Sequence, residues 1–432
     1  MPQEPRSKIV IVGGGQAGGR LAQLLCADAG RWEVILICRE PRPPYERPPL
    51  SKGILLGTAS FETCLLWPDS DPAWTRVERR SGVSVETIEC ETKTVRLSNG
   101  ERLRYDLLAL ATGSSARRLV CPGSDLAEIY HLRRIDDSLA ITGRFAEGKR
   151  LVVVGGGFIG LEVAACARRR KLDVTVVEGS DRLLARVVPP EIAGILAKRH
   201  AAEGVALKMG TMVERFIGNG RGAVKAVELS SGQILPCDIA VVGIGAKAET
   251  DLALAAGLEV TVGIRVDASL RSSDPSIFAC GDVATFWHPL FDEHIRVEAW
   301  QNAEDHARVA ASAMRGEAAI CDTVPWFWSD QYDLSLQIAG LPHLGSSSVT
   351  RALSDGAVIL FHLSPTGRLV GATGLGKAES IGRNIRAAQA LIAARIHPSP
   401  AALRDPAMRL RSMLSRPVAR PPDALRPEPI TG

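Results

Sequence analysis

The stretch "KIVIVGGGQAGGRLAQLL", Lys8 to Leu25, decides the fold of the first part of the chain. A β-branched apolar run leads into a Gly-x-Gly-x-x-Gly arrangement at Gly13, Gly15 and Gly18, and leucines then recur at helical spacing. A strand, a glycine turn and a helix in this order place a dinucleotide pyrophosphate at the helix N-terminus, which the glycines allow to approach closely. The next apolar run, "VILICRE", ends in Glu40, where an acidic side chain can bind an adenosine ribose. The stretch therefore predicts a dinucleotide-binding α/β unit.

A second stretch, "RLVVVGGGFIGLEVAACARRR", repeats the arrangement with Gly155, Gly157 and Gly160. The following strand closes on Glu178, and a carboxylate there accepts hydrogen bonds from a free ribose 2′-hydroxyl and repels a 2′-phosphate. This second site is therefore predicted to bind NADH in preference to NADPH. Arg182 is interpreted either as a phosphate partner or as a solvated surface charge.

Two dinucleotide sites in one chain suggest that two dinucleotides meet, and hydride transfer between a nicotinamide and a flavin is the chemistry available to such a pair. Far downstream, the short apolar strand in "SIFACGDVA" ends in Gly281 and Asp282. An aspartate beside a glycine at a strand end suits hydrogen bonding to a polyol such as the flavin ribityl chain. A plain Gly-Asp turn is the alternative, and on the residues alone both interpretations stay open.

Between the two fingerprints, "PYERPPLSKG", Pro44 to Gly53, combines several prolines with one lysine, Lys52. The prolines fix φ repeatedly and exclude a helix interior or a central strand, and a helical segment can begin after them. We interpret the segment as a stiff arm that holds Lys52 against a cofactor. An exposed lysine at a helix start is the alternative.

The composition narrows the classes of function that the chain can have. A chain of 432 residues is long enough for about two to four domains, and its net charge of +4 is too small to indicate nucleic acid binding. Apolar runs stay far below the ~20 residues of a membrane helix, and we find no secretion signal before the first strand, so a cytoplasmic location is expected. The 9 cysteines form no CxxC pair, which argues against a local redox dithiol, a thiolate metal site or an iron-sulfur cluster.

Further motifs make the whole resemble the two-dinucleotide flavoprotein superfamily, in which the first fingerprint holds FAD and the internal one holds NAD(P)H. These motifs are "YDLLALATGSSARRL", Tyr105 to Leu119, and "VVGIGAKAETDLALAAGL". Within that superfamily, "PYERPPLSK" and "VPWFWSDQYDLSLQIAG", Val324 to Gly340, resemble the ferredoxin reductases of bacterial cytochrome P450 and ring-hydroxylating Rieske dioxygenase systems. The resemblance covers residues from about Lys8 to about Ile396.

The resemblance implies two sets of cofactor-binding residues. For FAD they are Gly13, Gly15, Gly18, Glu40, Lys52, Val85, Ala111, Gly113, Arg133, Asp282 and Trp300. For NADH they are Gly155, Gly157, Phe158, Ile159, Gly160, Glu178, Gly243 and Gly245. It further implies that Lys52 lies next to the flavin ring and pairs with Glu162, and these two residues are the expected catalytic pair.

The implied reaction is that of an NADH-dependent ferredoxin reductase. Hydride passes from NADH to the flavin N5, and single electrons then leave to a [2Fe-2S] ferredoxin that feeds a P450 or a Rieske dioxygenase. Such ferredoxins are usually acidic, so cations near the flavin would steer docking, and we expect these among Arg308, Arg383 and Arg386 with Trp328 close by. Solvated arginines and a core tryptophan are the alternatives. A monomer and a homodimer both fit the sequence.

Three other functions are alternatives to this one. A monodehydroascorbate-reductase-like enzyme shares a similar PYERP-x-LSK segment. An interaction flavoprotein of the apoptosis-inducing-factor type would require a targeting segment and a strongly basic surface. An NADH oxidase or peroxidase would need a reactive cysteine beside the flavin, and Cys38 lies inside the strand "VILICRE", where burial is the more natural expectation.

The expected fold class is α/β, with two doubly wound Rossmann-like dinucleotide-binding domains and a small α+β C-terminal domain. The FAD-binding domain is expected at residues 1–115 and 248–322, with the NAD-binding domain at 116–247 inserted between them. From Val324 the pattern changes, and residues 324–410 are expected to form the C-terminal domain. Residues 411–432 are proline-rich and are expected to form an extended or disordered tail.

Overall fold

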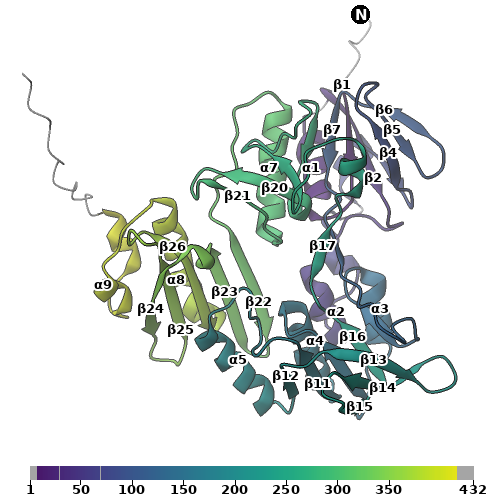
Figure 1. Ribbon diagram of the computed structural model, residues 1–432. Coiled ribbons are helices and arrows are strands. Elements are labelled where there is room, and N and C mark those ends of the chain that lie inside the picture. Colours follow the sequence, from purple (N-terminus) through teal and green to yellow (C-terminus); the bar gives the residue numbers. More distant parts are fainter. Residues whose placement is uncertain (1–6, 29, 69, 416–432) are drawn as a thin grey trace, which may run out of the picture.

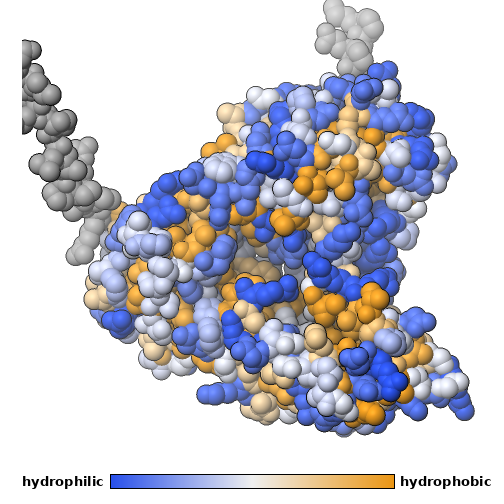
Figure 2. Space-filling view, in the orientation of Figure 1, coloured by the Kyte–Doolittle hydropathy of each residue, from blue (hydrophilic) through white to orange (hydrophobic). Residues whose placement is uncertain are grey.

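The computed structural model describes residues 7–28, 30–68 and 70–415, which form three parts (Figure 1). The N-terminal part lies at the top of Figure 1, the middle part at the lower right and the C-terminal part at the left. In the same orientation, Figure 2 shows a surface that is hollowed where the three parts meet. Among the described residues, no helix is long and apolar enough to span a bilayer.

The N-terminal part is built on a five-stranded parallel sheet in the order β19-β7-β1-β2-β3. Its strands are β1 (Ser7–Val12), β2 (Trp32–Cys38), β3 (Val77–Ser81), β7 (Leu107–Leu110) and β19 (Ile277–Ala279). Helices α1 (Gln16–Cys26) and α7 (Trp300–Met314) pack against each other on this sheet. Because β19 and α7 come from far downstream, two separate stretches of chain complete one core.

The middle part contains a second five-stranded parallel sheet in the order β12-β11-β10-β16-β9. Its strands are β9 (Ile129–His131), β10 (Arg150–Val154), β11 (Asp173–Glu178), β12 (Ala206–Met209) and β16 (Ile239–Val242). The helices of this part are α3 (Ile135–Thr142), α4 (Phe158–Arg169) and α5 (Pro190–Ala202). The last four residues of strand β1 and of strand β10 are all apolar and buried, as parallel sheets covered on both faces require.

Short sheets and helices surround these two cores. The short strands are β4 (Val85–Glu89), β5 (Thr94–Leu97), β6 (Arg102–Arg104), β8 (Ser114–Ala116), β13 (Val213–Gly218), β14 (Val224–Leu229), β15 (Ile234–Pro236), β17 (Ala246–Ala248), β18 (Ile264–Val266), β20 (Ala284–His288) and β21 (Glu293–Ile295). The short helices are α2 (Gly53–Leu56), α6 (Asp251–Ala255) and the 3-10 turns η1 (Pro48–Ser51), η2 (Glu62–Cys64), η3 (Pro72–Arg76) and η4 (Gly281–Val283). The antiparallel pair β8 and β17 joins the first two parts.

The C-terminal part is an antiparallel sheet in the order β22-β23-β26-β25-β24, covered by α8 (Ala378–Ala393). Its strands are β22 (Trp326–Gln331), β23 (Leu334–Gly340), β24 (Ser347–Ala352), β25 (Val358–Leu363) and β26 (Leu369–Gly376). The remaining elements are η5 (Pro342–Leu344), α9 (Pro400–Arg404) and η6 (Leu410–Ser415). The amphipathic helix and the two strands around Ser-Pro-Thr-Gly lie where their periodicity predicts them.

The predicted α/β fold class, with two doubly wound parallel sheets and a C-terminal domain, is confirmed. The exact domain boundaries stay an interpretation. The boundaries at 115/116 and 247/248 fall within the ribbon of β8 and β17. At the other end, Leu410 and Met413 are buried in η6, so packed chain continues past position 411, where the tail was expected to begin. The rest of that expected tail, 416–432, lies outside the described residues.

Candidate functional site

The first glycine fingerprint forms a tight turn between β1 and α1. Gly13 has φ +116°, and a Cβ atom on it would lie 2.2 Å from the carbonyl oxygen of Ala111. A Cβ atom on Gly18 would lie 1.9 Å from the carbonyl oxygen of Gly13, so both positions exclude a side chain. Beside Gly15, in contrast, no atom lies within 4 Å of the Cβ position, and no side chain caps the helix that it begins. Open space beside uncapped backbone N–H groups is what a pyrophosphate group requires.

The second fingerprint has the same geometry between β10 and α4. Gly155 has φ +109°, and a Cβ atom on it would lie 2.4 Å from the carbonyl oxygen of Gly243. A Cβ atom on Gly160 would lie 2.1 Å from the carbonyl oxygen of Gly155. Gly157 begins α4 without a side-chain cap, and only one atom, 3.9 Å away, comes near its Cβ position. The structure therefore contains two uncapped helix N-termini with the same geometry, each of which suits an anion.

Glu178 stands at the end of β11, directly beside this second helix terminus. Its carboxylate accepts hydrogen bonds from the backbone N–H groups of Gly156 at 2.6 Å and Ser180 at 2.8 Å. Arg182 donates to the carbonyl oxygens of Val188 and Ala185, each at 2.7 Å. The guanidinium of Arg182 is thus engaged with carbonyl oxygens of its own loop and is not simply a solvated charge, while its role as a phosphate partner stays a prediction.

The other residues expected at the NADH site lie around α4 and the end of β16. Phe158 packs against Phe327 of β22 with ring centroids 4.4 Å apart, and Ile159 is 42% exposed. Gly245 has φ +110°, and its Cβ position lies 3.3 Å from a guanidinium nitrogen of Arg186. These contacts surround the helix terminus, while the assignment of the residues to NADH stays a prediction.

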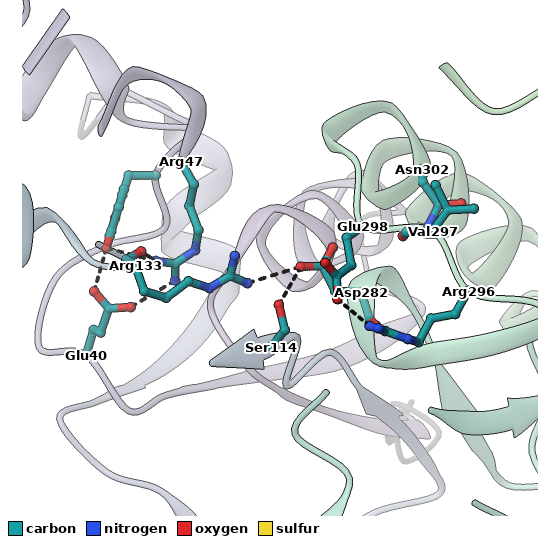
Figure 3. A network of polar contacts seen from close by, with 10 residues as sticks. Glu40, Arg47, Ser114, Arg133, Asp282, Arg296, Val297, Glu298 and Asn302 are labelled. Carbon is teal, nitrogen blue, oxygen red and sulfur yellow. Dashed lines mark hydrogen bonds and ion pairs between the residues drawn. The ribbon is translucent and has the colours of Figure 1, made fainter. Parts of the chain in front are cut away.

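Glu40 at the end of the β2 segment is held by two residues of the proline-rich arm (Figure 3). Tyr45 donates its hydroxyl proton to Glu40 at 2.6 Å, and Arg47 forms an ion pair with it at 2.9 Å. Burial acts to raise the pKa of Glu40, but Arg47 and Tyr45 outweigh burial and hold the pKa below its ordinary value. Sequence reasoning missed both partners, although each stands in the "PYERPP" motif that was singled out.

Figure 3 shows how the same network reaches Asp282. Arg47 donates to the backbone carbonyl of Arg133 at 2.5 Å, and the guanidinium of Arg133 contacts the Asp282 carboxylate at 3.1 Å. Ser114 donates to the same Asp282 oxygen at 2.8 Å. Glu40, Arg133 and Asp282 therefore come from three distant stretches and form one polar chain, as a cofactor site between β2, β7 and β19 requires.

Of three further residues expected at FAD, two lie beside the site and one lies in a separate sheet. Ala111 follows β7 and touches the glycine turn, and Gly113 has φ +68° with its Cβ position 3.5 Å from Arg133. Val85 begins β4 in a separate small sheet. Val83, not singled out from the sequence, is the residue whose N–H donates to the carbonyl of Cys38 at the end of β2, at 3.2 Å.

Lys52 and Glu162 meet, although 110 residues separate them. The Lys52 ammonium lies 2.8 Å from the Glu162 carboxylate, and their side chains are 24% and 3% exposed. Ser51 donates to the oxygen that binds Lys52, and Ser329 of β22 donates to the other oxygen at 2.6 Å. The buried carboxylate thus has partners at both oxygens, which a buried charge needs. The proline arm, the second fingerprint helix and the C-terminal sheet meet at this carboxylate.

A cluster of tryptophans lies on the opposite face of β22. Trp326 and Trp328 stack with ring centroids 4.9 Å apart, and Trp300, the first residue of α7, contacts Trp328 edge-on at 6.1 Å. Arg308 is about half exposed but is paired with Glu304 at 3.3 Å and Asp305 at 2.7 Å. The exposed arginines of α8 are Arg383 and Arg386.

No cysteine among the 9 in the chain is disulfide-bonded, and each has a pKa above its ordinary value. Burial is the main cause in every case, and it raises the pKa of Cys38 to about 12. Cys38 is 2% exposed and lies beneath Gly14 of the first fingerprint. A thiol in this state is a packing residue and not a nucleophile.

Comparison with known proteins gives one consistent result. A family model described as pyridine nucleotide-disulphide oxidoreductase matches residues 7–307, and one described as reductase C-terminal matches residues 326–414. The ferredoxin–NAD(+) reductase component of the anthranilate 1,2-dioxygenase system of Burkholderia cepacia is 40% identical over 410 residues, which cover 94% of this chain and 98% of that protein.

Two solved structures are similar over nearly the whole chain. A chain of the covalent putidaredoxin reductase–putidaredoxin complex has a TM-score of 0.90 at 32% identity, with 94% of this chain and 98% of that chain covered. The ferredoxin reductase for the CYP199A2 system of Rhodopseudomonas palustris has a TM-score of 0.87 at 36% identity, with 94% and 99% covered. Both fingerprints and the C-terminal sheet lie within these matches, so the chain belongs to the pyridine nucleotide-disulphide oxidoreductase family, in its group of ferredoxin reductases.

Proposed function

We propose that the protein is an NADH-dependent ferredoxin reductase that holds FAD at the first fingerprint and reduces a [2Fe-2S] ferredoxin. The ferredoxin in turn feeds a P450 or a Rieske dioxygenase. One observation carries the proposal most directly: the buried Glu162 of the second fingerprint helix holds Lys52 of the proline arm at 2.8 Å. This ion pair joins the two dinucleotide-binding parts at the place where their cofactors would have to meet.

The residues around the first fingerprint fit FAD. The open space at Gly15, beside the uncapped start of α1, suits the pyrophosphate group. Glu40, fixed by Tyr45 and Arg47, suits the task of accepting hydrogen bonds from ribose hydroxyl groups. Asp282 is held by Ser114 and Arg133 at the end of the neighbouring strand, which suits the ribityl chain.

FAD, when bound, accepts a hydride from NADH and releases the two electrons singly. The task of Lys52 is to place a positive charge beside the ring system, which favours the reduced, more negative cofactor. Glu162 orients that ammonium and lowers the cost of removing it from water. Glu178 holds the NADH ribose and, through its charge, disfavours the 2′-phosphate of NADPH.

The proposed acceptor is a ferredoxin, a one-electron protein, because the similar reductases are named for that acceptor. Among the described residues the cysteines are all free. Every cysteine there is held as an unreactive thiol, so a dithiol relay of the disulphide-reductase kind has no support. Trp328 and Trp300 are proposed to lie between the flavin site and the docked ferredoxin. Arg383 and Arg386 supply exposed positive charge on α8, while the charge of Arg308 is largely balanced by its two acidic neighbours.

The activity is tested by mixing the yellow holoprotein with NADH or NADPH and measuring cytochrome c reduction with and without a [2Fe-2S] ferredoxin. We expect flavin bleaching much faster with NADH, and cytochrome c reduction only when the ferredoxin is present. Fast turnover with oxygen or peroxide in the absence of ferredoxin would contradict the proposal.

The role of Lys52 is tested by Lys52→Met, which keeps the length of the side chain and removes its charge. We expect FAD to remain bound, the rate constant of flavin reduction by NADH to fall about tenfold or more, and the flavin midpoint potential to become more negative. Lys8→Met removes a lysine from a surface ion pair with Glu33 and is the matched control. If Lys52→Met changes neither the rate of flavin reduction nor the midpoint potential, the proline-rich arm is only a turn and the proposed role of Lys52 is wrong.

A further inference from the structure

A line of buried polar side chains continues from Glu162 into the C-terminal sheet. Ser329 lies 2.6 Å from Glu162, and Gln331, two residues along β22, lies 3.1 Å from Ser329. Gln331 then contacts His200 of α5 at 2.8 Å, and His200 contacts the hydroxyl of Tyr332 at 3.2 Å. From Glu162 to His200 no side chain is more than 3% exposed, so water does not compete for these hydrogen bonds.

The protons in this line are arranged in one direction. Burial lowers the pKa of His200, so its ring is neutral and carries a single proton. Burial likewise raises the pKa of Tyr332, so its hydroxyl keeps a proton that it can donate to Nδ1 of His200 when Nδ1 carries none. Nε2 of His200 then donates to the Gln331 amide oxygen, the Gln331 amide nitrogen donates to Ser329, and Ser329 donates to Glu162.

The opposite orientation of the Gln331 amide fails on the count of protons. With the amide oxygen facing Ser329, the single hydroxyl proton of Ser329 would face two acceptors, the amide oxygen and the ionised Glu162 carboxylate. One of these two contacts of the Ser329 hydroxyl would then have no proton between its oxygens, and one buried hydrogen bond would remain unmade. When each group in the line donates toward Glu162, every contact in the line has one proton.

The far end of the line is anchored by the turn between β22 and β23. Gln331 pairs with Leu334, which leaves Tyr332 and Asp333 as a two-residue turn, and Tyr332 takes φ +60°. Glycine is favoured at such a position, yet here a tyrosine packs edge-on against the His200 ring at 5.1 Å. Asp333 pairs with Arg199 of the same helix, so the turn is fastened to α5 from both sides.

We propose that Ser329, Gln331, His200 and Tyr332 are positioning residues for Lys52, acting through a one-directional hydrogen-bond chain that ends on Glu162. The inference rests on the proposed role of Lys52 beside the flavin. Four donors in sequence polarise one another and draw negative charge away from the oxygen of Glu162 that faces Ser329. More of the positive charge of Lys52 is then left for the reduced flavin, and the C-terminal sheet becomes part of the flavin site.

The chain offers a matched control for this effect. Ser335 and Gln337 on β23 repeat the same pair of residue types at the same spacing, with the Gln337 amide 3.4 Å from Ser335. Both are buried in the same sheet, and neither contacts Glu162. Ser335→Ala therefore removes an equivalent buried hydroxyl without touching the line.

The test measures flavin reduction by NADH in stopped flow, together with the flavin midpoint potential, on FAD-loaded protein. For Ser329→Ala we expect a rate constant lower by about fivefold and a more negative potential, as for a coupled neighbour of a charged pair. Gln331→Met, which keeps shape but donates nothing, should change both in the same direction by less. Ser335→Ala should match the wild type. Equal rate and potential in Ser329→Ala and Ser335→Ala would overturn the proposal.

A double-mutant cycle separates this inference from the proposed function. If Lys52→Met slows reduction and Ser329→Ala slows it no further in that background, the line acts through Lys52. An additional, undiminished loss in the double variant would overturn the inference and leave the role of Lys52 intact. If Lys52→Met itself changes nothing, the proposed role of Lys52 fails first.

The direction of the line has an independent readout that needs no turnover. In protein labelled with ¹⁵N-histidine, with His200→Gln used for assignment, the His200 ring should carry its proton on Nε2 from pH 6 to 8 (about the range in which an ordinary histidine titrates). A ring protonated on Nδ1 would overturn the proposal.

Discussion

At the residue scale, Glu40 near the end of β2 and Glu178 at the end of β11 are held in different ways. Glu40 is bound by the side chains of Tyr45 and Arg47, so its charge is balanced by a cation. Glu178 is bound by backbone N–H groups of its own loop, and Arg182 beside it is engaged with carbonyl oxygens. No ion pair with Glu178 is found among the described residues, and under the proposed function this carboxylate lies where NADPH would bring its 2′-phosphate.

This difference leads to a prediction about coenzyme choice. Glu178→Gln keeps the size of the side chain and removes its charge, so the preference for NADH over NADPH in kcat/KM should fall by about tenfold to hundredfold. Steady-state reduction of an artificial acceptor with both coenzymes measures it. Glu228→Gln, which breaks a surface ion pair with Arg215 in the same part of the molecule, should leave the preference unchanged. The same preference in Glu178→Gln as in the wild type would show that the carboxylate does not select the coenzyme.

At the element scale, α7 holds the turn that carries Asp282. His306 on this helix is fully buried, and its Nδ1 accepts a hydrogen bond from the N–H of Gly281 at 3.1 Å. Its ring packs edge-on against Phe286 of β20 at 4.4 Å. Burial, with a contribution from His288, lowers the pKa of His306 to about 3. The neutral ring can accept this hydrogen bond at Nδ1, whereas a protonated ring could not.

This buried histidine predicts acid sensitivity. A pKa that is lower in the folded than in the unfolded chain stabilises the fold above the unfolded pKa of about 6.5, and that stability is lost as the pH falls below it. His306 alone should reduce the free energy of unfolding by about 2 kcal/mol between pH 7 and pH 5. His306→Asn supplies a similar acceptor without a titrating ring, so its loss between these pH values should be smaller.

Urea unfolding at several pH values measures this effect. His343→Asn, in an exposed histidine of η5, is the control and should retain the acid sensitivity of the wild type. If His306→Asn and the wild type lose the same free energy of unfolding between pH 7 and pH 5, His306 is not the cause of the acid sensitivity. Other buried histidines, such as His362 with a pKa lowered to about 4 by burial, contribute the remainder.

At the scale of the whole molecule, the two faces of strand β22 contact different parts of the protein. Phe327, Ser329 and Gln331 face the middle part, while Trp326 and Trp328 face α7, because neighbouring residues of a strand point to opposite sides. One strand thereby lines the proposed path to the ferredoxin on one face and holds Glu162 on the other. Figure 2 shows that the surface is hollowed between the three parts that these two faces connect.

Docking of an acidic ferredoxin predicts a dependence on salt. Replacing Arg383 and Arg386 together by glutamine should lower ferredoxin-dependent cytochrome c reduction several-fold at low ionic strength and flatten its decline with added salt. The rate of flavin reduction by NADH should not change, because neither arginine belongs to the cofactor sites. Arg104→Gln, an exposed arginine of β6, is the control. Unaltered salt dependence in the double variant would place the docking surface away from α8.

Much of the fold could be predicted from local signals. Gly13 and Gly155 need positive φ and tolerate no Cβ atom, and a strand before and a helix after each of them follow from periodicity alone. The pairing of Lys52 with Glu162 was foreseen only through the resemblance of two motifs to a known family. The residues that complete this pair were not foreseen, because serine and glutamine at alternate positions of a strand are also typical of a plain surface.

By itself, the sequence determined two dinucleotide-binding units, their order along the chain and a distinct C-terminal domain, because glycine sterics and apolar periodicity act between near neighbours. Only the tertiary structure decided which groups share the Glu162 carboxylate. Ser329 reaches it from 167 residues away, and His200 joins through Gln331 from 131 residues away. The physical reason is that a buried charge must find its partners wherever packed sheets bring donors within hydrogen-bond distance, and no local pattern encodes that distance.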